Sequence, residues 1–208
     1  MSFFSSLSAE VAQEVQNYHK LFSLAENACK RVELLCLEGV LFPAVNELRY
    51  AGFHLKLALV ADSEKDVLKE IRLGQDHAGR AGHDAYDALA IFYIEQCDVF
   101  IEEFKTVSIP KAYPGYLTDL GKLQNARRAL ADAYRKATVE LDLAAKEAQV
   151  DLLEEVYNNF EIARGEANKL KDEAQVNARR HAINSAVGLA ALLFAALACV
   201  AAWLGLKS

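Results

Sequence analysis

Apolar residues recur every three or four positions along most of this chain, a spacing that is typical of amphipathic helices. The first run begins at Val11, directly after Ser8, which is a good N-cap residue, and it reaches Cys36. Pro43 then suits the first turn of a second helix, "PAVNELRYAGFHLKLALVA". No stretch of useful length alternates as a β-strand would. The pattern therefore predicts an all-α fold.

A long third helix is predicted over 63–104, with Asp62 or Ser63 as its cap. Its middle contains three glycines, each of which costs about 1 kcal/mol relative to alanine inside a helix. These are Gly74, Gly79 and Gly82. They predict either a kink or a close contact with another helix, and the sequence leaves both open.

Beyond the proline-containing loop "KTVSIPKAYPGYLT", the helical spacing continues without another proline from Leu117 toward the C-terminus. This length exceeds that of an ordinary globular helix and indicates a coiled-coil-like stalk. Gly165 is the one candidate break.

The chain ends in an apolar segment, which has 21 residues without a charge from Ala186 to Leu206. A helix of this length, at about 1.5 Å per residue, spans roughly 30 Å, the thickness of the hydrocarbon core of a bilayer. Trp203 lies near one end, where interfacial aromatic residues are common. We predict a single transmembrane helix here.

The predicted architecture is a cytoplasmic helical bundle with a long coiled-coil-like helix that leads into one C-terminal transmembrane helix. Its parts are an N-terminal sensor and oligomerisation domain (1–116), a stalk helix (117–180) and a transmembrane helix (181–208). Basic residues flank the span unevenly. Those before it are Lys169, Lys171, Arg179 and Arg180, and only Lys207 follows it. Because positive residues favour the cytoplasmic side, we expect single-pass insertion in the inner (cytoplasmic) membrane with the N-terminal domain in the cytoplasm.

Small residues four apart in the span, such as Ala186 and Ala190, allow helices to approach closely in lipid. In a segment so rich in alanine, composition alone also produces such pairs. We expect the spans to self-associate in a homo-oligomer, with a tetramer as the expected number. Asn184 and Ser185 either line the pore of such a bundle or mark the headgroup boundary.

Charge is distributed unevenly in this chain of 208 residues and formal net charge −6. The segment 105–137 has seven basic and two acidic residues, hence a net charge of +5, with tyrosines interleaved. This composition is typical of sites for single-stranded nucleic acid or nucleotides, although the acidic remainder argues against general DNA binding. The ligand-binding candidates are Lys111, Tyr116, Lys122, Arg127, Arg128 and Arg135. The alternative is a basic surface that docks on the acidic remainder of this subunit or of another.

The third helix carries a second polar group. His77, Arg80, Asp84 and Asp87 share one of its faces at spacings of three and four. This face is either a ligand pocket, with His77 and Arg80 as binding residues, or an ion-paired strip. The sequence has no P-loop, Rossmann, G-x-S-x-G or H-E-x-x-H motif, so we expect neither enzyme activity nor a metal or cofactor.

Two Arg-x4-His spacings also occur, Arg49 with His54 and Arg72 with His77. Helical ribonucleases of the HEPN class use such a spacing, with arginine on the scissile phosphate and histidine in acid–base catalysis. A motif this short also arises by chance. A membrane-tethered ribonuclease is therefore kept as an alternative.

The cysteines and the N-terminus indicate the compartment. Cys29, Cys36, Cys97 and Cys199 form no C-x-x-C pair, and we interpret them as free, buried thiols of a reducing compartment. The start of the chain, "MSFFSSLSAE", has no basic region and no long apolar region, so we expect no secretory signal.

The combination of "NELRYAGFHLKLAL", "HAGRAGHDAYDAL", a long helix and one Ala-rich C-terminal span resembles the small membrane effectors of bacterial anti-phage operons. It most resembles the HalA-type membrane component of Hailong systems. The resemblance implies a homo-oligomeric ion channel that is held shut by a short DNA oligomer, the product of a partner nucleotidyltransferase. Loss of the oligomer would open the channel and arrest the cell. The second interpretation is a tail-anchored coiled-coil scaffold that conducts nothing.

Overall fold

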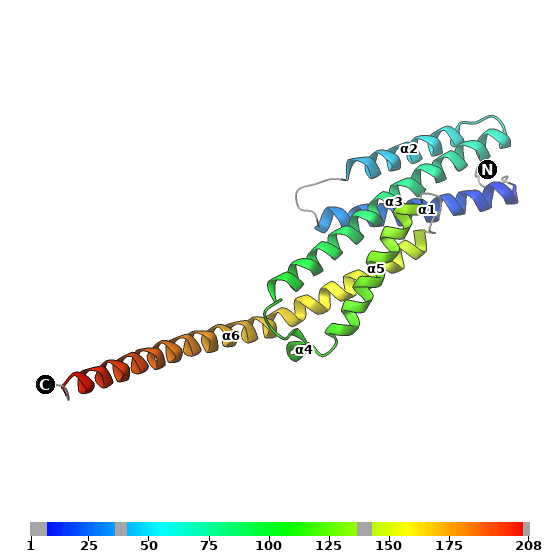
Figure 1. The fold of residues 1–208 in the computed structure, drawn as a ribbon. Helices are drawn as coiled ribbons and strands as arrows, with labels where there is room; N and C mark the ends of the chain where they lie inside the picture. The colour runs from blue at the N-terminus through cyan, green and yellow to red at the C-terminus, as the bar shows by residue number, and fades with distance from the viewer. Residues whose placement is uncertain (1–7, 36–40, 137–142, 206–208) are drawn as a thin grey trace. The chain divides into compact units, whose positions relative to one another are not determined.

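The computed structural model describes residues 8–35, 41–136 and 143–205, which form six helices and no strand (Figure 1). The helices are α1 (Ala9–Leu35), α2 (Phe42–Leu59), α3 (Glu64–Glu103), α4 (Ile109–Ala112), α5 (Tyr116–Lys136) and α6 (Leu143–Gly205). The predicted all-α fold with a long, apolar C-terminal helix is confirmed.

The first three helices begin at the residues that the sequence predicts. Ser8 Oγ accepts a hydrogen bond from Val11 N at 3.3 Å, and Ser63 Oγ accepts one from Asp66 N at 3.2 Å. Each serine thereby satisfies a backbone donor that the first turn leaves unpaired. Pro43 lies in the first turn of α2, where its missing N–H costs nothing.

The helices belong to two compact units, and the domain borders at 116 and 180 stay predictions. The first unit contains α1, α2, α3 up to Val99, α5 from Thr118 and α6 up to Asn159. The second contains residues 100–117 and the remainder of α6.

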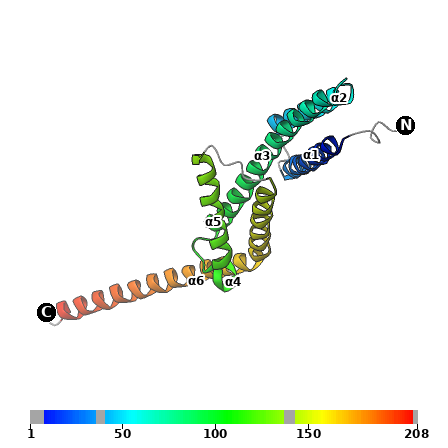
Figure 2. The ribbon, with the colours of Figure 1, turned by 90° about the vertical axis from the view of Figure 1, so that its right-hand side faces the viewer.

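In the first unit, α3 packs against both α1 and α2 (Figures 1 and 2). Gln75 Nε2 donates to Glu14 O of α1 at 2.9 Å. The core between these helices consists of Val11, Tyr18, Ala51, Ala58, Val67, Ile71 and Ala78. The small side chains of Ala51, Ala58 and Ala78 let the backbones of α2 and α3 approach closely.

Two of the three glycines on α3 are points of close contact. A Cβ added at Gly74 would lie 2.6 Å from Cε2 of Tyr18, and one at Gly82 would lie 2.8 Å from Cδ1 of Leu143. Gly79 has no such neighbour within 4 Å. Because α3 is one helix through all three positions, the contact interpretation holds for Gly74 and Gly82.

The prediction of one helix over 117–180 is corrected. The structure has α5 and α6, and the residues between them, 137–142, lie outside the described part of the chain. The two helices run antiparallel, since Asn159 bonds to Asp119 at 2.8 Å and Gln149 bonds to Ala126 O at 3.2 Å. Apolar residues recur every three or four positions both in one long helix and in two shorter helices that pack together. The sequence pattern therefore did not distinguish the two arrangements. The candidate break at Gly165 is absent, because α6 continues through it.

The second unit has an aromatic core. Phe100, Phe104 and Phe160 are fully buried, and the Phe100 and Phe160 rings stack with centroids 4.8 Å apart. The guanidinium of Arg164 lies 5.5 Å from the Phe100 ring centroid, and Arg164 also pairs with Glu103. This core holds the segment of α6 that leads into the apolar run.

Candidate functional site

A cluster of polar side chains lies between α2 and α3 and is built as two pairs. Nδ1 of His54 lies 2.7 Å from Oε2 of Glu70, and Nδ1 of His77 lies 2.7 Å from Oε2 of Glu47. The two imidazole rings stack, with centroids 5.1 Å apart and planes 17° from parallel. Arg80 completes the cluster, because its Nε donates to Glu47 Oε2 at 2.8 Å. We call these five residues the histidine–glutamate cluster.

The antiparallel packing of α2 on α3 brings this cluster together. One pair joins residues 47 and 77, and the other joins residues 54 and 70. Residue numbers therefore increase along α2 in the direction in which they decrease along α3. All four side chains of these pairs are largely shielded from solvent. Nδ1 of His77 also lies 2.7 Å from Nη2 of Arg80, and this nitrogen can donate to Glu47 or accept from Arg80 but cannot do both. The hydrogen-bond pattern of the cluster therefore depends on which ring nitrogen of His77 carries the proton.

The charge of Glu47 is stabilised inside the cluster. Burial opposes ionisation of its carboxyl group, but the hydrogen bonds from His77 and Arg80 outweigh burial and lower its pKa. A negative Glu47 is the partner that holds Arg80 and His77 against α2. The cluster thus links the two helices through hydrogen bonds and the ion pair between Arg80 and Glu47.

A dependence of stability on pH follows from Glu47. Its pKa is below the ordinary value of 4.5 in the folded chain, so its ionisation stabilises the fold above that value and this contribution is lost as the pH falls through the lowered pKa. We expect the urea midpoint of the detergent-solubilised protein to fall between about pH 5 and pH 3, and to fall less in Glu47→Gln. Glu95→Gln, at an exposed position of α3, serves as the matched control and should keep the wild-type pH profile. Equal profiles for all three proteins would contradict this role of Glu47.

The polar face of α3 forms ion pairs with neighbouring helices and not along its own surface. His77 and Arg80 pair with Glu47 of α2, and Asp87 accepts from Lys146 of α6 at 2.6 Å. The pKa of Asp84 is raised, first by burial and then by the charges of Asp87 and Glu47. Arg80 and Asp87 of this face are therefore ion-paired with residues of α2 and α6, partners that the helical spacing did not indicate. Ligand binding at His77 and Arg80 stays a prediction.

The Arg-x4-His spacings do not bring arginine and histidine of one motif to a common contact. Arg72 pairs with Glu10 and Glu14 of α1 at 2.9 and 3.1 Å, and Arg49 lies over the ring of Tyr50 at 5.0 Å. Both histidines of the motifs instead belong to the histidine–glutamate cluster, where each has a carboxylate partner.

The basic candidates of the segment 105–137 are distributed over several contacts. Lys122 lies 3.0 Å from Asp119 and 2.9 Å from Glu155, and Arg127 pairs with Asp98. Arg128 is exposed on α5. Arg135 lies near the end of α5, and its side chain is outside the described part of the chain, as is that of Trp203. These pairs support the docking interpretation for Lys122 and Arg127.

The remaining candidates of this segment lie in the second unit. Lys111 is exposed on α4, and the ring of Tyr116 packs on Phe160 with centroids 5.6 Å apart. Burial raises the pKa of Tyr116. Tyr116 is thus a packing residue of the aromatic core, and Lys111 is the candidate there that is open to solvent.

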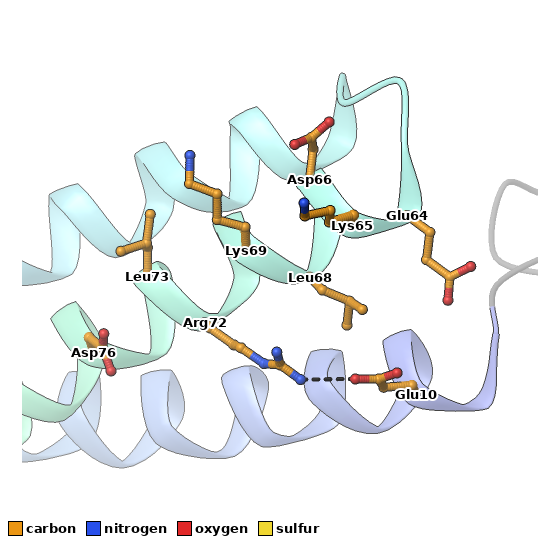
Figure 3. Close-up of a pocket in the computed structure, with 9 residues that line it drawn as sticks. All are labelled: Glu10, Glu64, Lys65, Asp66, Leu68, Lys69, Arg72, Leu73 and Asp76. Carbon is orange, nitrogen blue, oxygen red and sulfur yellow. Dashed lines mark hydrogen bonds and ion pairs between the residues drawn. The ribbon is translucent and has the colours of Figure 1, made fainter.

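Sequence reasoning missed a pocket of about 650 Å³ that lies over the first half of α3 and the start of α1 (Figure 3). The residues that line it are Glu10, Glu64, Lys65, Asp66, Leu68, Lys69, Arg72, Leu73 and Asp76. Figure 3 shows Arg72 reaching from α3 to Glu10 on α1. The volume suits a small ligand. Four carboxylates outnumber three cations in the lining, so the pocket does not favour a polyanion. The spacing of Lys65, Lys69 and Arg72 was visible in the sequence, but the facing carboxylate of Glu10 was not.

The C-terminal part of α6 is exposed at residues 172–197, 199 and 200. Asn184 and Ser185 are exposed, as are the large apolar residues that follow them, among them Leu192 and Phe194. Within the described residues, one helix is long and apolar enough to cross a membrane, and none of its apolar window is buried against the chain. This agrees with a single-pass membrane protein.

The cysteines and the metal candidates complete the chemical inventory. Cys29, Cys97 and Cys199 are free, and burial raises the pKa of Cys29 to about 11. Cys199 is exposed on the apolar part of α6, which corrects the expectation that all four thiols are buried, and Cys36 lies outside the described residues. The residues that the structure describes contain no group of three or more histidine, cysteine or acidic side chains suited to a metal ion.

The chain was compared with known proteins at the level of families, curated sequences and solved structures. No family, no curated protein and no solved structure matches it.

Proposed function

We propose that this protein is a homo-oligomeric membrane effector, in which a cytoplasmic helical domain controls an ion channel formed by the C-terminal spans, as in the anti-phage effectors that it resembles. The observation that carries the proposal is α6. Its first part supplies the buried residues Val150, Leu153 and Val156, and the same helix continues to Gly205 through the apolar run. A change in packing around the first part of α6 can therefore move the span directly, because one continuous helix connects the two.

The membrane part of the proposal rests on the uncovered apolar surface. A soluble monomer does not usually leave a run such as Leu192, Leu193 and Phe194 exposed. Lipid and neighbouring spans would together cover it, with Arg179 and Arg180 on the cytoplasmic side of the inner membrane. A single span encloses no pore, so conduction requires several copies, and we propose a tetramer.

The proposed ligand is a short nucleic acid or nucleotide from a partner nucleotidyltransferase, bound by basic residues of α5. Arg127 pairs with Asp98 and Lys122 pairs with Glu155, and both of these carboxylates are more than half exposed, whereas the second partner of Lys122, Asp119, is buried. Exposed ion pairs contribute only about 0–1 kcal/mol, so phosphate groups can replace such carboxylates at small cost. Binding would bias the channel only if the closed and open states differ in affinity for the ligand.

A planar-bilayer recording of the purified, reconstituted protein tests the proposal. We expect discrete conductance steps, and a reduced open probability when a short DNA oligomer is added to the cytoplasmic side. If Asn184 lines the pore, Asn184→Leu should change the unitary conductance, because a polar group at the pore mouth is replaced by an apolar one. Asn177→Leu makes the same substitution two turns earlier, outside the apolar run, and should leave the conductance unchanged.

The recording also separates the channel from the scaffold. A variant in which residues 186–206 are replaced by an unrelated apolar helix should insert but not conduct, and it should lose its toxicity to cells. If this variant keeps its toxicity, the span is only an anchor and the scaffold interpretation replaces the channel. If the conductance does not change when the DNA oligomer is added, the proposed ligand is wrong and the proposed channel still stands.

A further inference from the structure

The outward side of α2 carries apolar and basic side chains at helical spacing. Phe42, Val45, Arg49, Phe53, Lys56 and Val60 follow one another at intervals of three and four. The opposite side of the helix packs on the domain through the buried residues Ala44, Ala51 and Ala58. We call the outward residues, with the flanking Tyr50 and Leu59, the outer face of α2.

This face exposes a large apolar area. The exposed fractions are 69% for Phe42, 51% for Phe53 and 70% for Val60, and Val45, Tyr50 and Leu59 are exposed as well. With ~200 Å² for a fully exposed aromatic side chain and somewhat less for Val and Leu, these six residues expose on the order of 600 Å². That is as large as the largest apolar patch of a typical monomer, and most of the ~800 Å² that each partner contributes to a stable interface.

The charges on the outer face identify its partner. Arg49 and Lys56 are exposed there, and both are basic. The one carboxylate of α2, Glu47, is turned inward to His77 and Arg80. The chain as a whole has a net charge of −6, so a second copy offers an excess of acidic surface to this basic face.

We infer that the outer face of α2 is a subunit interface and that its occupant is a second copy of this chain. The inference rests on the proposed homo-oligomer and gives it a contact in the soluble domain, in addition to that between spans. Phe42 and Phe53 are the apolar anchors, because large, exposed aromatic residues release the most water-accessible surface on docking. Arg49 and Lys56 set the orientation of the second copy through its carboxylates.

The oligomeric state of the detergent-solubilised full chain, measured by native mass spectrometry over a dilution series, tests the inference. We expect Phe42→Ser with Phe53→Ser to weaken association at least tenfold. Leu34→Ser is the matched control, because Leu34 is 78% exposed on α1 and lies outside the outer face of α2. Far-UV circular dichroism should show the same helix content in all three proteins, since the replaced side chains are exposed.

The outcomes separate this inference from the proposed function. A wild type that is monomeric at every concentration would overturn both. An oligomer that survives the double substitution, yet dissociates when the span is replaced, would overturn the interface on α2 and leave the channel in place. A loss of association on Arg49→Glu with Lys56→Glu, and its weakening by salt in the wild type, would support docking on acidic surface.

A probe at the outer face distinguishes a second copy from a lipid surface. A fluorophore is attached through Asn46→Cys, at an exposed position of α2 beside the outer face, with the exposed Cys199 replaced by alanine. Protection from iodide that is lost on dilution in detergent supports the subunit interface. Protection that arises only in vesicles with anionic lipid, and not in detergent-solubilised oligomers, would overturn it in favour of a helix on the membrane surface.

Discussion

Replacement of Phe160 by alanine is expected to destabilise the second unit by about 3–5 kcal/mol, the usual cost of removing a fully buried phenylalanine. Phe160 has no exposed surface, stacks on Phe100 and packs against Tyr116. Its loss leaves a cavity among aromatic rings that are held by the helices around them and cannot collapse to fill it. The cavity lies in the second unit, in the packed segment of α6 that precedes the apolar run.

Amide hydrogen exchange of the reconstituted protein measures this effect. We expect faster exchange over residues 100–104 and 160–167 in Phe160→Ala, together with a lower thermal midpoint. Ile162→Ala provides the control, because Ile162 lies on the same helix two residues away and is 80% exposed. It should change stability by less than about 0.5 kcal/mol. Similar exchange in both variants would show that the aromatic core does not hold this segment of α6.

The second large effect concerns two glycines of α3, at which substitution by alanine is expected to change the stability of the fold in opposite directions. Gly74→Ala is expected to destabilise the fold by about 1–3 kcal/mol, because the new methyl group would lie 2.6 Å from the Tyr18 ring and 3.3 Å from the backbone oxygen of Ala51. Gly79→Ala is expected to stabilise it by about 1 kcal/mol, because no such neighbour lies within 4 Å and alanine favours the helix.

Thermal unfolding followed by circular dichroism in detergent compares the two variants directly. They differ by one methyl group each, on one helix and five residues apart, so propensity alone would move both midpoints upward. A Gly74→Ala protein that is more stable than the wild type would mean that α1, α2 and α3 are not as closely packed as the structure has them.

Two kinds of contact hold the helices of the first unit together. The close contacts at glycine and alanine hold α1, α2 and α3 together, and the histidine–glutamate cluster adds a charged clamp between α2 and α3. In the described part of the chain, both leave the outer face of α2 exposed. In an oligomer that covers this face, α2 would therefore contact the second copy with its outer side. Its inner side is held to α3 by the pairs that the charge of Glu47 makes with His77 and Arg80.

The candidate site was only partly accessible from the sequence. His77 and Arg80 were recognised as neighbours on α3, because helical spacing places residues three apart on one face. Their partner Glu47 is 30 positions away from His77, and only the antiparallel docking of α2 brings it within 2.7 Å. The basic residues of α5 were likewise visible as a charged segment, but the carboxylates Asp98 and Glu155 that pair with them come from α3 and α6.

By itself, the sequence determined the properties that depend on neighbours along the chain. These are the helical class, the starts of the first three helices at Ser8, at Pro43 and at Asp62 or Ser63, and the length and apolar character of the C-terminal segment. Each depends on side chains a few positions apart, through capping, propensity and periodicity. Only the tertiary structure decided that α5 and α6 fold back on each other, which glycines are contacts, and which charges are paired. An apolar stripe indicates which face of a helix is buried, but it does not indicate which helix packs against that face. The partner helix is determined by contacts between residues far apart in the chain.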